Sequence, residues 1–100
     1  MKKSNPNNTT DDSNADILSL RSAIDKIDEK ILDLINERLL LAQQIGHIKK
    51  QRSIRIVDKD REKEIINRLA ERNKGPLGDD ALHHIFTAII AGGRSVQRTL

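Results

Sequence analysis

Apolar residues recur at alternating spacings of three and four between Ala15 and Gln51. This stretch contains no proline and a single glycine, Gly46, so one helix can continue through it. The alternation is the heptad pattern of a helix that packs along its length against other helices. It breaks once, at Arg38. The apolar positions, which we call the seam, are 17, 20, 24, 27, 31, 34, 41, 45 and 48.

The length of this first helix exceeds what one small chain can cover. A helix of about 36 residues is about 54 Å long. A compact domain of 100 residues has a radius of gyration of only about 13 Å. We therefore expect a second copy of the chain to cover the remainder of the seam, in a homodimer.

Two shorter helices are predicted to follow. The second begins at Asp58, whose carboxylate can cap the first turn, and runs to about Asn73. A glycine and proline turn, NKGPLG, separates it from a third helix that begins after Asp79 or Asp80. The fold class is therefore all-α, with three helices and a very long first one. The residues of the third helix expected to face inward are Leu82, Ile85, Phe86, Ile89, Ile90 and Val96.

Residues 1–14 form a polar leader of Asn, Ser, Thr, Asp and Lys with Pro6. This composition buries too little apolar surface to offset chain entropy, so we expect the leader to be disordered and the helical domain to span residues 15–100. The leader lacks the apolar run of a signal peptide, and no later stretch is long enough to span a bilayer. The chain also contains no cysteine. We expect a cytoplasmic protein without a membrane partner.

The net charge of +3 arises from 18 basic and 15 acidic residues that are interleaved along the chain. The segment KKQR, residues 49–52, is the one basic cluster, and no aromatic residue stands beside it for base stacking. We therefore do not expect nucleic acid as a partner, although a helical DNA-binding or interaction module is an alternative. Such a module would need its cations on an exposed face.

Charged residues also stand on faces that are predicted to be buried. On the second helix, the positions three, four and seven before the apolar residues Ile65, Ile66 and Leu69 share their face. These positions include Asp58, Arg61 and Glu62.

The first and third helices carry similar polar groups. Lys49 follows Arg38 by eleven residues, which returns it to nearly the same side of the helix about 16 Å farther along. Gln97 ends the apolar stripe of the third helix. An ion pair across a dimer seam would explain Arg38 alone, and a frayed terminus would explain Gln97 alone. Taken together, these groups predict a pocket for a small polar anion, because isolated buried charges are costly.

These residues together resemble the all-helical chorismate mutases, which include free-standing enzymes and the mutase domains of bifunctional proteins of aromatic amino-acid biosynthesis. The resemblance runs from about Ala15 to Gln97. It is carried by LRSAIDKIDEKILDLINERLLLAQQIGHIKK, VDKDRE and IFTAIIAGGRSVQ. It implies an intertwined homodimer of three-helix chains whose two active sites convert chorismate to prephenate. The reaction is a concerted Claisen rearrangement, with no covalent intermediate, no cofactor and no metal.

The same resemblance implies roles for individual residues. Arg38 and Arg21 of the partner subunit bind the substrate carboxylates. Lys49 reaches the ether oxygen and a carboxylate, and Gln97 donates to the ether oxygen.

The acidic residues of the second helix are expected to hold the ring hydroxyl. Glu62 binds this hydroxyl, with Asp58 close to the same group. Arg61 is expected to support both Glu62 and the carboxylate side of the substrate.

Helical geometry supports the contribution of Arg21 from the partner subunit. Within one straight helix, Arg21 and Arg38 are separated by about 25 Å and by roughly 100° of rotation, so they cannot bind one small molecule together. If two first helices cross antiparallel near residues 29 and 30, Arg21 of one lies opposite Arg38 of the other.

One position departs from the pattern of the family. Gly93 stands where a serine hydroxyl commonly helps to hold a carboxylate, so we expect weaker substrate binding. Gly92 and Gly93 each cost about 1 kcal/mol relative to alanine in a helix interior. Close backbone packing or space for a ligand would explain them.

Three other hypotheses stay open. An isochorismate pyruvate lyase shares this fold, but it generally lacks the complete segment with Asp58, Arg61 and Glu62. A degenerate mutase domain with a regulatory role is the second. A metal site at His83 and His84 is the third, although adjacent histidines at a helix start are more often exposed. A further domain, such as a prephenate dehydratase, could follow in a longer natural chain.

Overall fold

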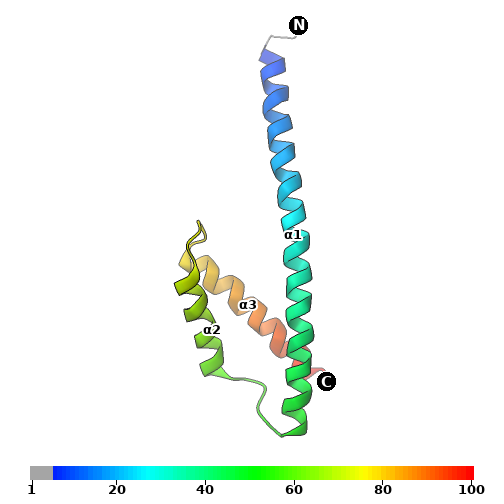
Figure 1. Ribbon diagram of the computed structural model, residues 1–100, viewed down its shortest axis with the longest axis vertical. Helices are drawn as coiled ribbons and strands as arrows, with labels where there is room; N and C mark the ends of the chain where they lie inside the picture. The colour runs from blue at the N-terminus through cyan, green and yellow to red at the C-terminus, as the bar shows by residue number, and fades with distance from the viewer. Residues whose placement is uncertain (1–5) are drawn as a thin grey trace. The chain divides into compact units, whose positions relative to one another are not determined.

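The computed structural model describes residues 6–100, with side chains described from Asn14 onward. Within this range the chain forms three helices and no strand: α1 (Pro6–Gln51), α2 (Lys59–Arg72) and α3 (Asp79–Arg98) (Figure 1). The all-α prediction is confirmed. The chain divides into a first unit that ends at Leu34 and a second unit from Ile35 to Leu100, and α1 contributes to both.

The start of α1 differs from the prediction. The helix begins at Pro6, so residues 6–14 are helical although we expected them to be disordered. Proline is compatible with the first position of a helix, because its fixed φ is helical and its missing N–H would have no partner there. Once the following heptads have formed helix, each further residue adds one hydrogen bond at little cost. Residues 1–5 of the expected leader lie outside the described residues, and a domain boundary at residue 15 stays a prediction.

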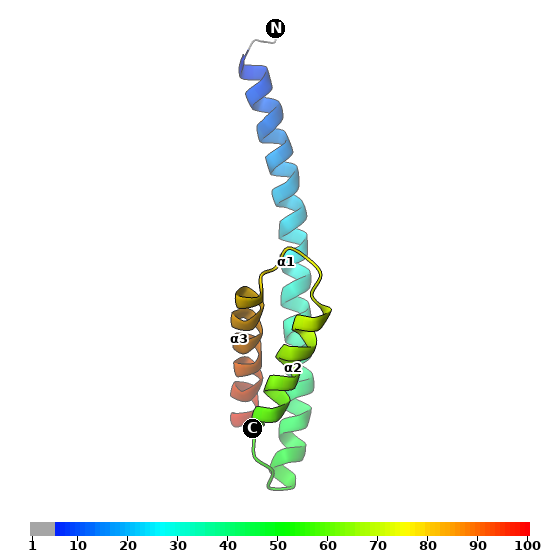
Figure 2. The same ribbon diagram turned by 90° about the vertical axis from the view of Figure 1, so that its left-hand side faces the viewer.

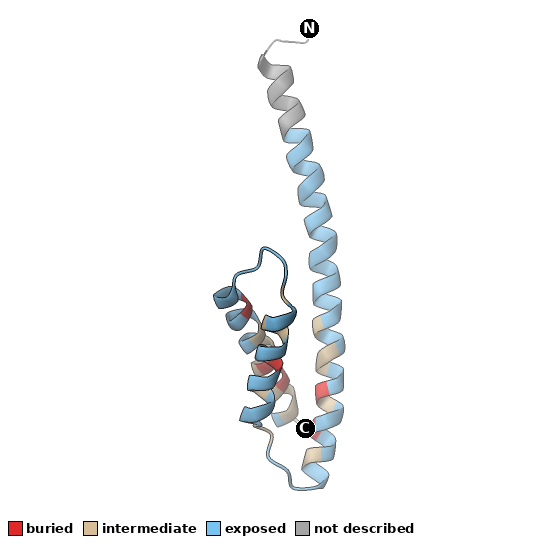
Figure 3. Cartoon of the chain, turned by 60° about the vertical axis from the view of Figure 1, so that its left-hand side comes forward, coloured by how far each residue is buried: buried red, intermediate tan, exposed pale blue. Residues whose placement is uncertain are grey.

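The seam of the first unit is uncovered in the single chain. Figure 3 shows the described part of this stretch as exposed throughout. The side chains of the seam residues Ile17, Leu20, Ile24, Ile27, Ile31 and Leu34 are between 45% and 66% exposed. In the second unit, the seam residues Leu41, Ile45 and Ile48 are exposed as well. Apolar side chains at this spacing are therefore available for a partner helix.

The second unit has a small core to which all three helices contribute. Its buried apolar residues are Ala42 on α1, Ile65 on α2, and Leu82 and Ile90 on α3. Helices α2 and α3 contact each other and run in opposite directions (Figure 2). Within the described residues, every helix lacks the long apolar stretch that crossing a bilayer requires.

The predicted inner face of α3 is partly confirmed. Leu82 and Ile90 are buried, and Phe86, Ile89 and Val96 are half-buried. Ile85 is 46% exposed, so its prediction as an inward-facing residue is wrong for the single chain. The apolar stripe of α3 is wider than the face that this unit covers, and Ile85 lies at its uncovered margin.

Local signals define both ends of α2 as predicted, whereas α3 begins at Asp79 itself, one residue or more before its predicted start. Asp58 is the N-cap of α2, and its Oδ1 accepts a hydrogen bond of 3.0 Å from the backbone N–H of Arg61. At the other end, the backbone N–H of Asn73 donates to the carbonyl of Leu69, and its side chain donates to the carbonyl of Leu77. The caps hold both ends of α2 and thus fix the direction in which its charged face points.

Candidate active site

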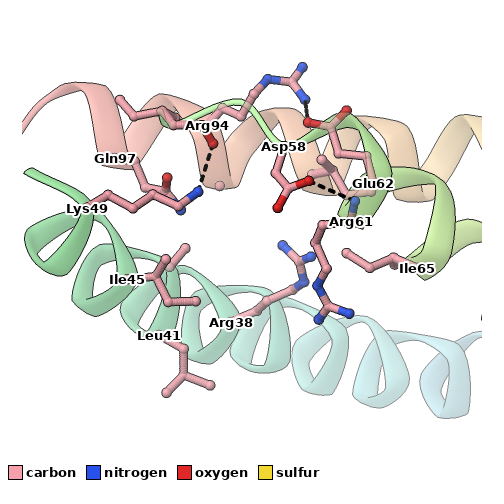
Figure 4. A pocket seen from close by; sticks show the side chains of 14 residues that line it. Arg38, Leu41, Ile45, Lys49, Asp58, Arg61, Glu62, Ile65, Arg94 and Gln97 are labelled. Carbon is pink, nitrogen blue, oxygen red and sulfur yellow. Dashed lines mark hydrogen bonds and ion pairs between the residues drawn. The ribbon is translucent and has the colours of Figure 1, made fainter. Parts of the chain in front are cut away.

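A cavity of about 400 Å³ lies within the second unit (Figure 4). Helices α1, α2 and α3 and the loop between α1 and α2 all contribute to its wall. Six of the seven predicted site residues line it, namely Arg38, Lys49, Asp58, Arg61, Glu62 and Gln97. The seventh, Arg21, is an exposed residue of the first unit.

Cationic side chains outnumber carboxylates in the lining of the cavity. Four cationic side chains and two carboxylates face this cavity, which gives a net charge of +2. The rest of the wall is largely aliphatic and includes Leu41, Ile45, Ile56, Ile65 and Ile90. A cavity with apolar walls and an excess of cations is suited to a small anion that also has apolar surface.

Lys49 is held by the loop that follows α1. Its Nζ donates a hydrogen bond of 2.9 Å to the carbonyl of Ile56, and its side chain is half-buried. The backbone of the same residue accepts a hydrogen bond from the N–H of Ile54 at 2.8 Å. An ammonium group has three donors, so the contact with Ile56 leaves Lys49 able to donate to a ligand.

Arg38 lies beside Gly93 of α3. A Cβ atom built on Gly93 would lie 3.5 Å from Nη1 of Arg38 and 3.7 Å from Cβ of Ala42, and one on Gly92 would lie 3.8 Å from Leu39. These are ordinary van der Waals distances. Close packing therefore does not require glycine at either position, and a small side chain at residue 93 would fit beside Arg38.

The ion pairs of α2 differ from the expected ones. The guanidinium group of Arg61 contacts Glu64, and both side chains are more than half exposed. Glu62 instead accepts a hydrogen bond of 2.7 Å from Nη1 of Arg94 on α3. Arg61 lines the cavity, and in this single chain it pairs with Glu64, so its expected support of Glu62 stays a prediction. An arginine and a glutamate three residues apart on a helix are close neighbours, which favours the pair with Glu64.

Sequence reasoning missed Arg94 as a residue of this site. It lines the cavity and precedes Gln97 by three residues, which places both on one side of α3. The spacing of three residues between Arg94 and Gln97 was the signal in the sequence that could have identified Arg94. The segment IFTAIIAGGRSVQ contains Arg94, but the prediction used only the apolar stripe, the glycines and Gln97 of this segment.

Gln97 presents a buried polar atom to the cavity. Its Oε1 is buried, and among the described residues it has no hydrogen-bond partner. A buried acceptor without a partner is costly, so this amide is suited to a ligand or a water molecule. The two ends of an amide exchange by a half turn about its terminal bond, so Gln97 can offer either an acceptor or a donor at this place.

Gly46 allows the end of α3 to approach α1 closely. A Cβ atom at this position would lie 2.7 Å from Cδ1 of Leu100 and 2.9 Å from Cγ of Gln97. Both distances are shorter than real Cβ contacts, so an added methyl group would displace these side chains. Nearby, Nζ of Lys50 donates to the backbone oxygen of Leu100 at 3.1 Å. Gly46 thus determines how deeply Gln97 sits beside α1.

Gly46 and Gly92 should respond differently to replacement by alanine. We expect Gly92→Ala to raise the free energy of unfolding by about 0.5 to 1 kcal/mol, because alanine is the better helix former and the new methyl group has space. Gly46→Ala should show no such gain, because the displacement of Gln97 and Leu100 offsets it. Urea unfolding of both variants at one protein concentration tests this. Equal gains would contradict the close approach at Gly46.

Comparisons with known proteins identify the family of this chain. Residues 20–98 match the family described as chorismate mutase type II. The chain is 38% identical over 89 residues to a bifunctional chorismate mutase/prephenate dehydratase of Aquifex aeolicus, a match that covers 85% of this chain and 25% of that protein. It is 37% identical over 83 residues to a chorismate mutase of Methanocaldococcus jannaschii, with 82% and 84% of the two chains covered.

A solved structure of chorismate mutase from Thermus thermophilus shares the fold. The TM-score is 0.80 at 29% sequence identity, and the match covers 82% of this chain and 93% of the other. The chain spans about a quarter of the length of the bifunctional relative and most of the length of the free-standing one. Since the match to the family extends over all three helices and includes every predicted site residue, the chain belongs to the chorismate mutase type II family.

Proposed function

We propose that this chain converts chorismate to prephenate. The observation that carries the proposal is the cavity of the second unit, where four cations, two carboxylates and the amide of Gln97 converge from three helices. Chorismate has two carboxylates, a ring hydroxyl and an ether oxygen, and this wall has groups that match one carboxylate, the hydroxyl and the ether oxygen. Family membership and the names of the relatives support the same activity. We further propose a cytoplasmic location.

The proposed mechanism needs no covalent chemistry from the protein. The carbon–oxygen bond of the ether breaks while a carbon–carbon bond forms in the same step, so the chain must hold a compact substrate conformer and stabilise charge on the ether oxygen. Lys49 and Gln97 lie at the same end of the cavity in Figure 4, and both can donate to that oxygen. Arg38 binds a carboxylate. Glu62 and Asp58 hold the ring hydroxyl.

We propose that the functional unit is a homodimer with shared sites. The exposed seam of α1 supports this, because apolar side chains at heptad spacing are stabilised by a partner helix. The helical spacing between Arg21 and Arg38 supports it too, because one chain cannot bring both to one molecule. Arg21 of the partner subunit would then bind the second carboxylate.

The direct test is the disappearance of chorismate, followed by its near-ultraviolet absorbance. The chain contains neither Trp nor Tyr, so its own absorbance interferes little. Prephenate is identified by its conversion to phenylpyruvate in acid. Saturable turnover to prephenate would support the proposal. Release of pyruvate from isochorismate, without turnover of chorismate, would favour the lyase instead.

Asp58 offers a test that separates folding from binding. We expect Asp58→Ala to lower the free energy of unfolding by about 1 kcal/mol, because α2 loses the acceptor at its N-cap. Asp58→Asn should keep the stability, since asparagine caps equally well, yet raise KM for chorismate because the carboxylate is gone. Urea unfolding and steady-state kinetics measure the two effects. A wild-type KM in Asp58→Asn would remove Asp58 from the substrate site.

A further inference from the structure

The ion pair between Arg94 and Glu62 joins α3 to α2 at the wall of the cavity (Figure 4). The two atoms are 2.7 Å apart, and the side chains are 27% and 21% exposed. The pair between Arg61 and Glu64 is 56% and 55% exposed. Solvent screens the pair of Arg94 and Glu62 less than it screens the exposed pair. Arg94 therefore restricts the carboxylate of Glu62 more effectively than Arg61 restricts that of Glu64.

The contact with Arg94 engages one of the two oxygens of Glu62. Nη1 of Arg94 contacts Oε2, so the second oxygen, Oε1, can accept a hydrogen bond from a ligand hydroxyl. A glutamate side chain has three rotatable bonds and would otherwise sample several orientations. With one oxygen tied to a neighbouring helix, far fewer orientations remain when the substrate binds.

We propose that Arg94 is a positioning residue, which acts on the substrate through Glu62 by holding its carboxylate toward the ring hydroxyl. This role rests on the proposed function. The ring hydroxyl keeps its bonds during the rearrangement, so its contact with Glu62 is equally strong in the ground state and in the transition state. Loss of such a contact raises KM and leaves kcat nearly unchanged.

The test replaces Arg94 with methionine, which keeps an unbranched apolar stem but removes the charge. We expect KM for chorismate to rise roughly tenfold with kcat within about twofold of the wild type. Arg94→Lys, which retains a cation, should recover most of the loss. Arg68→Met is the matched control, because it removes an exposed arginine of α2 that pairs with Glu64 at 3.7 Å and lies outside the lining of the cavity. Its KM should stay near that of the wild type.

A double variant distinguishes positioning from general attraction of the substrate. In a Glu62→Gln background, Arg94→Met should have little further effect on KM, because no carboxylate is left to hold. A full additional rise in that background would overturn the proposal, since Arg94 would then attract the anionic substrate directly. An unchanged KM in Arg94→Met would overturn it as well.

The kinetic comparison requires that each variant is folded. Circular dichroism and thermal unfolding of each variant show whether the helices are intact, and Arg94→Lys tests the proposal where Arg94→Met fails to fold. If the lysine variant keeps its fold and shows a tenfold loss of kcat at unchanged KM, the positioning role is wrong. Absence of turnover in the wild-type protein would instead contradict the proposed function, and this role would fall with it.

Discussion

We expect replacement of Lys49 with alanine to lower kcat for the conversion of chorismate about a hundredfold to a thousandfold, because a donor aimed at developing charge is lost. The ether oxygen becomes more negative as its bond breaks, so the ammonium group binds the transition state more tightly than the substrate. Lys50→Ala is the matched control. It removes the same charge from the neighbouring residue, which is exposed and lies outside the lining of the cavity.

The structural contact of Lys49 requires a second variant. Nζ also donates to the carbonyl of Ile56, so Lys49→Ala can loosen the loop after α1 as well as remove a donor. Lys49→Arg retains a cation that can donate to the same carbonyl, although its planar fork differs in shape from an ammonium group. We expect it to keep the stability of the wild type and to recover only part of kcat. Near-normal turnover in Lys49→Ala, measured on folded protein, would contradict the proposed role.

If the proposed homodimer shares its sites, we expect a mixture of Arg21→Ala and Arg38→Ala chains to regain activity that neither variant has alone. In a heterodimer of these chains, both substitutions fall in one site and the other site keeps both arginines. Random exchange at equal concentrations gives heterodimers in about half of the dimers, so about a quarter of all sites are intact. We expect turnover near that fraction of the wild-type value.

A second mixture shows whether the recovery reflects shared sites. Arg38 and Lys49 line one cavity in one chain, so a heterodimer of Arg38→Ala and Lys49→Ala chains has a defect in each site. This mixture should stay inactive. Recovery in both mixtures, or in neither although subunit exchange is demonstrated, would refute the contribution of Arg21 from the partner subunit.

The sequence best predicted those helix ends that are determined by residues close by in the chain. The cap at Asp58 and the turn after Asn73 act within a few residues, and both ends of α2 lie where they were expected. The start of α1 was missed, because polar composition suggested disorder while a helix can extend backward from the stable heptads on its C-terminal side. The exposure of Ile85 was missed because periodicity gives the direction of a stripe, not the width of the surface that covers it.

The site, too, was predicted only in part from the sequence. Helical spacing placed six charged or polar residues on inner faces, and the structure brings all six to one cavity. Spacing could not tell which acid an arginine would meet, since that depends on rotamers and on the distance between helices. Arg61 therefore lies on Glu64, and Arg94 on Glu62. The contribution of Arg21 stays a prediction, because it depends on a second chain.

The small core of the second unit implies that the proposed homodimer would also determine how stable this chain is. Among the described side chains, the buried apolar ones are few, and the seam of α1 is exposed. In the proposed homodimer, a chain with so little internal burial would gain most of its stability from its partner, so we expect its melting temperature to rise with protein concentration. Newly made chains that have not yet paired would be exposed to proteases. Substitutions along the seam would thus lower the amount of enzyme in a cell before they altered the rate of the reaction.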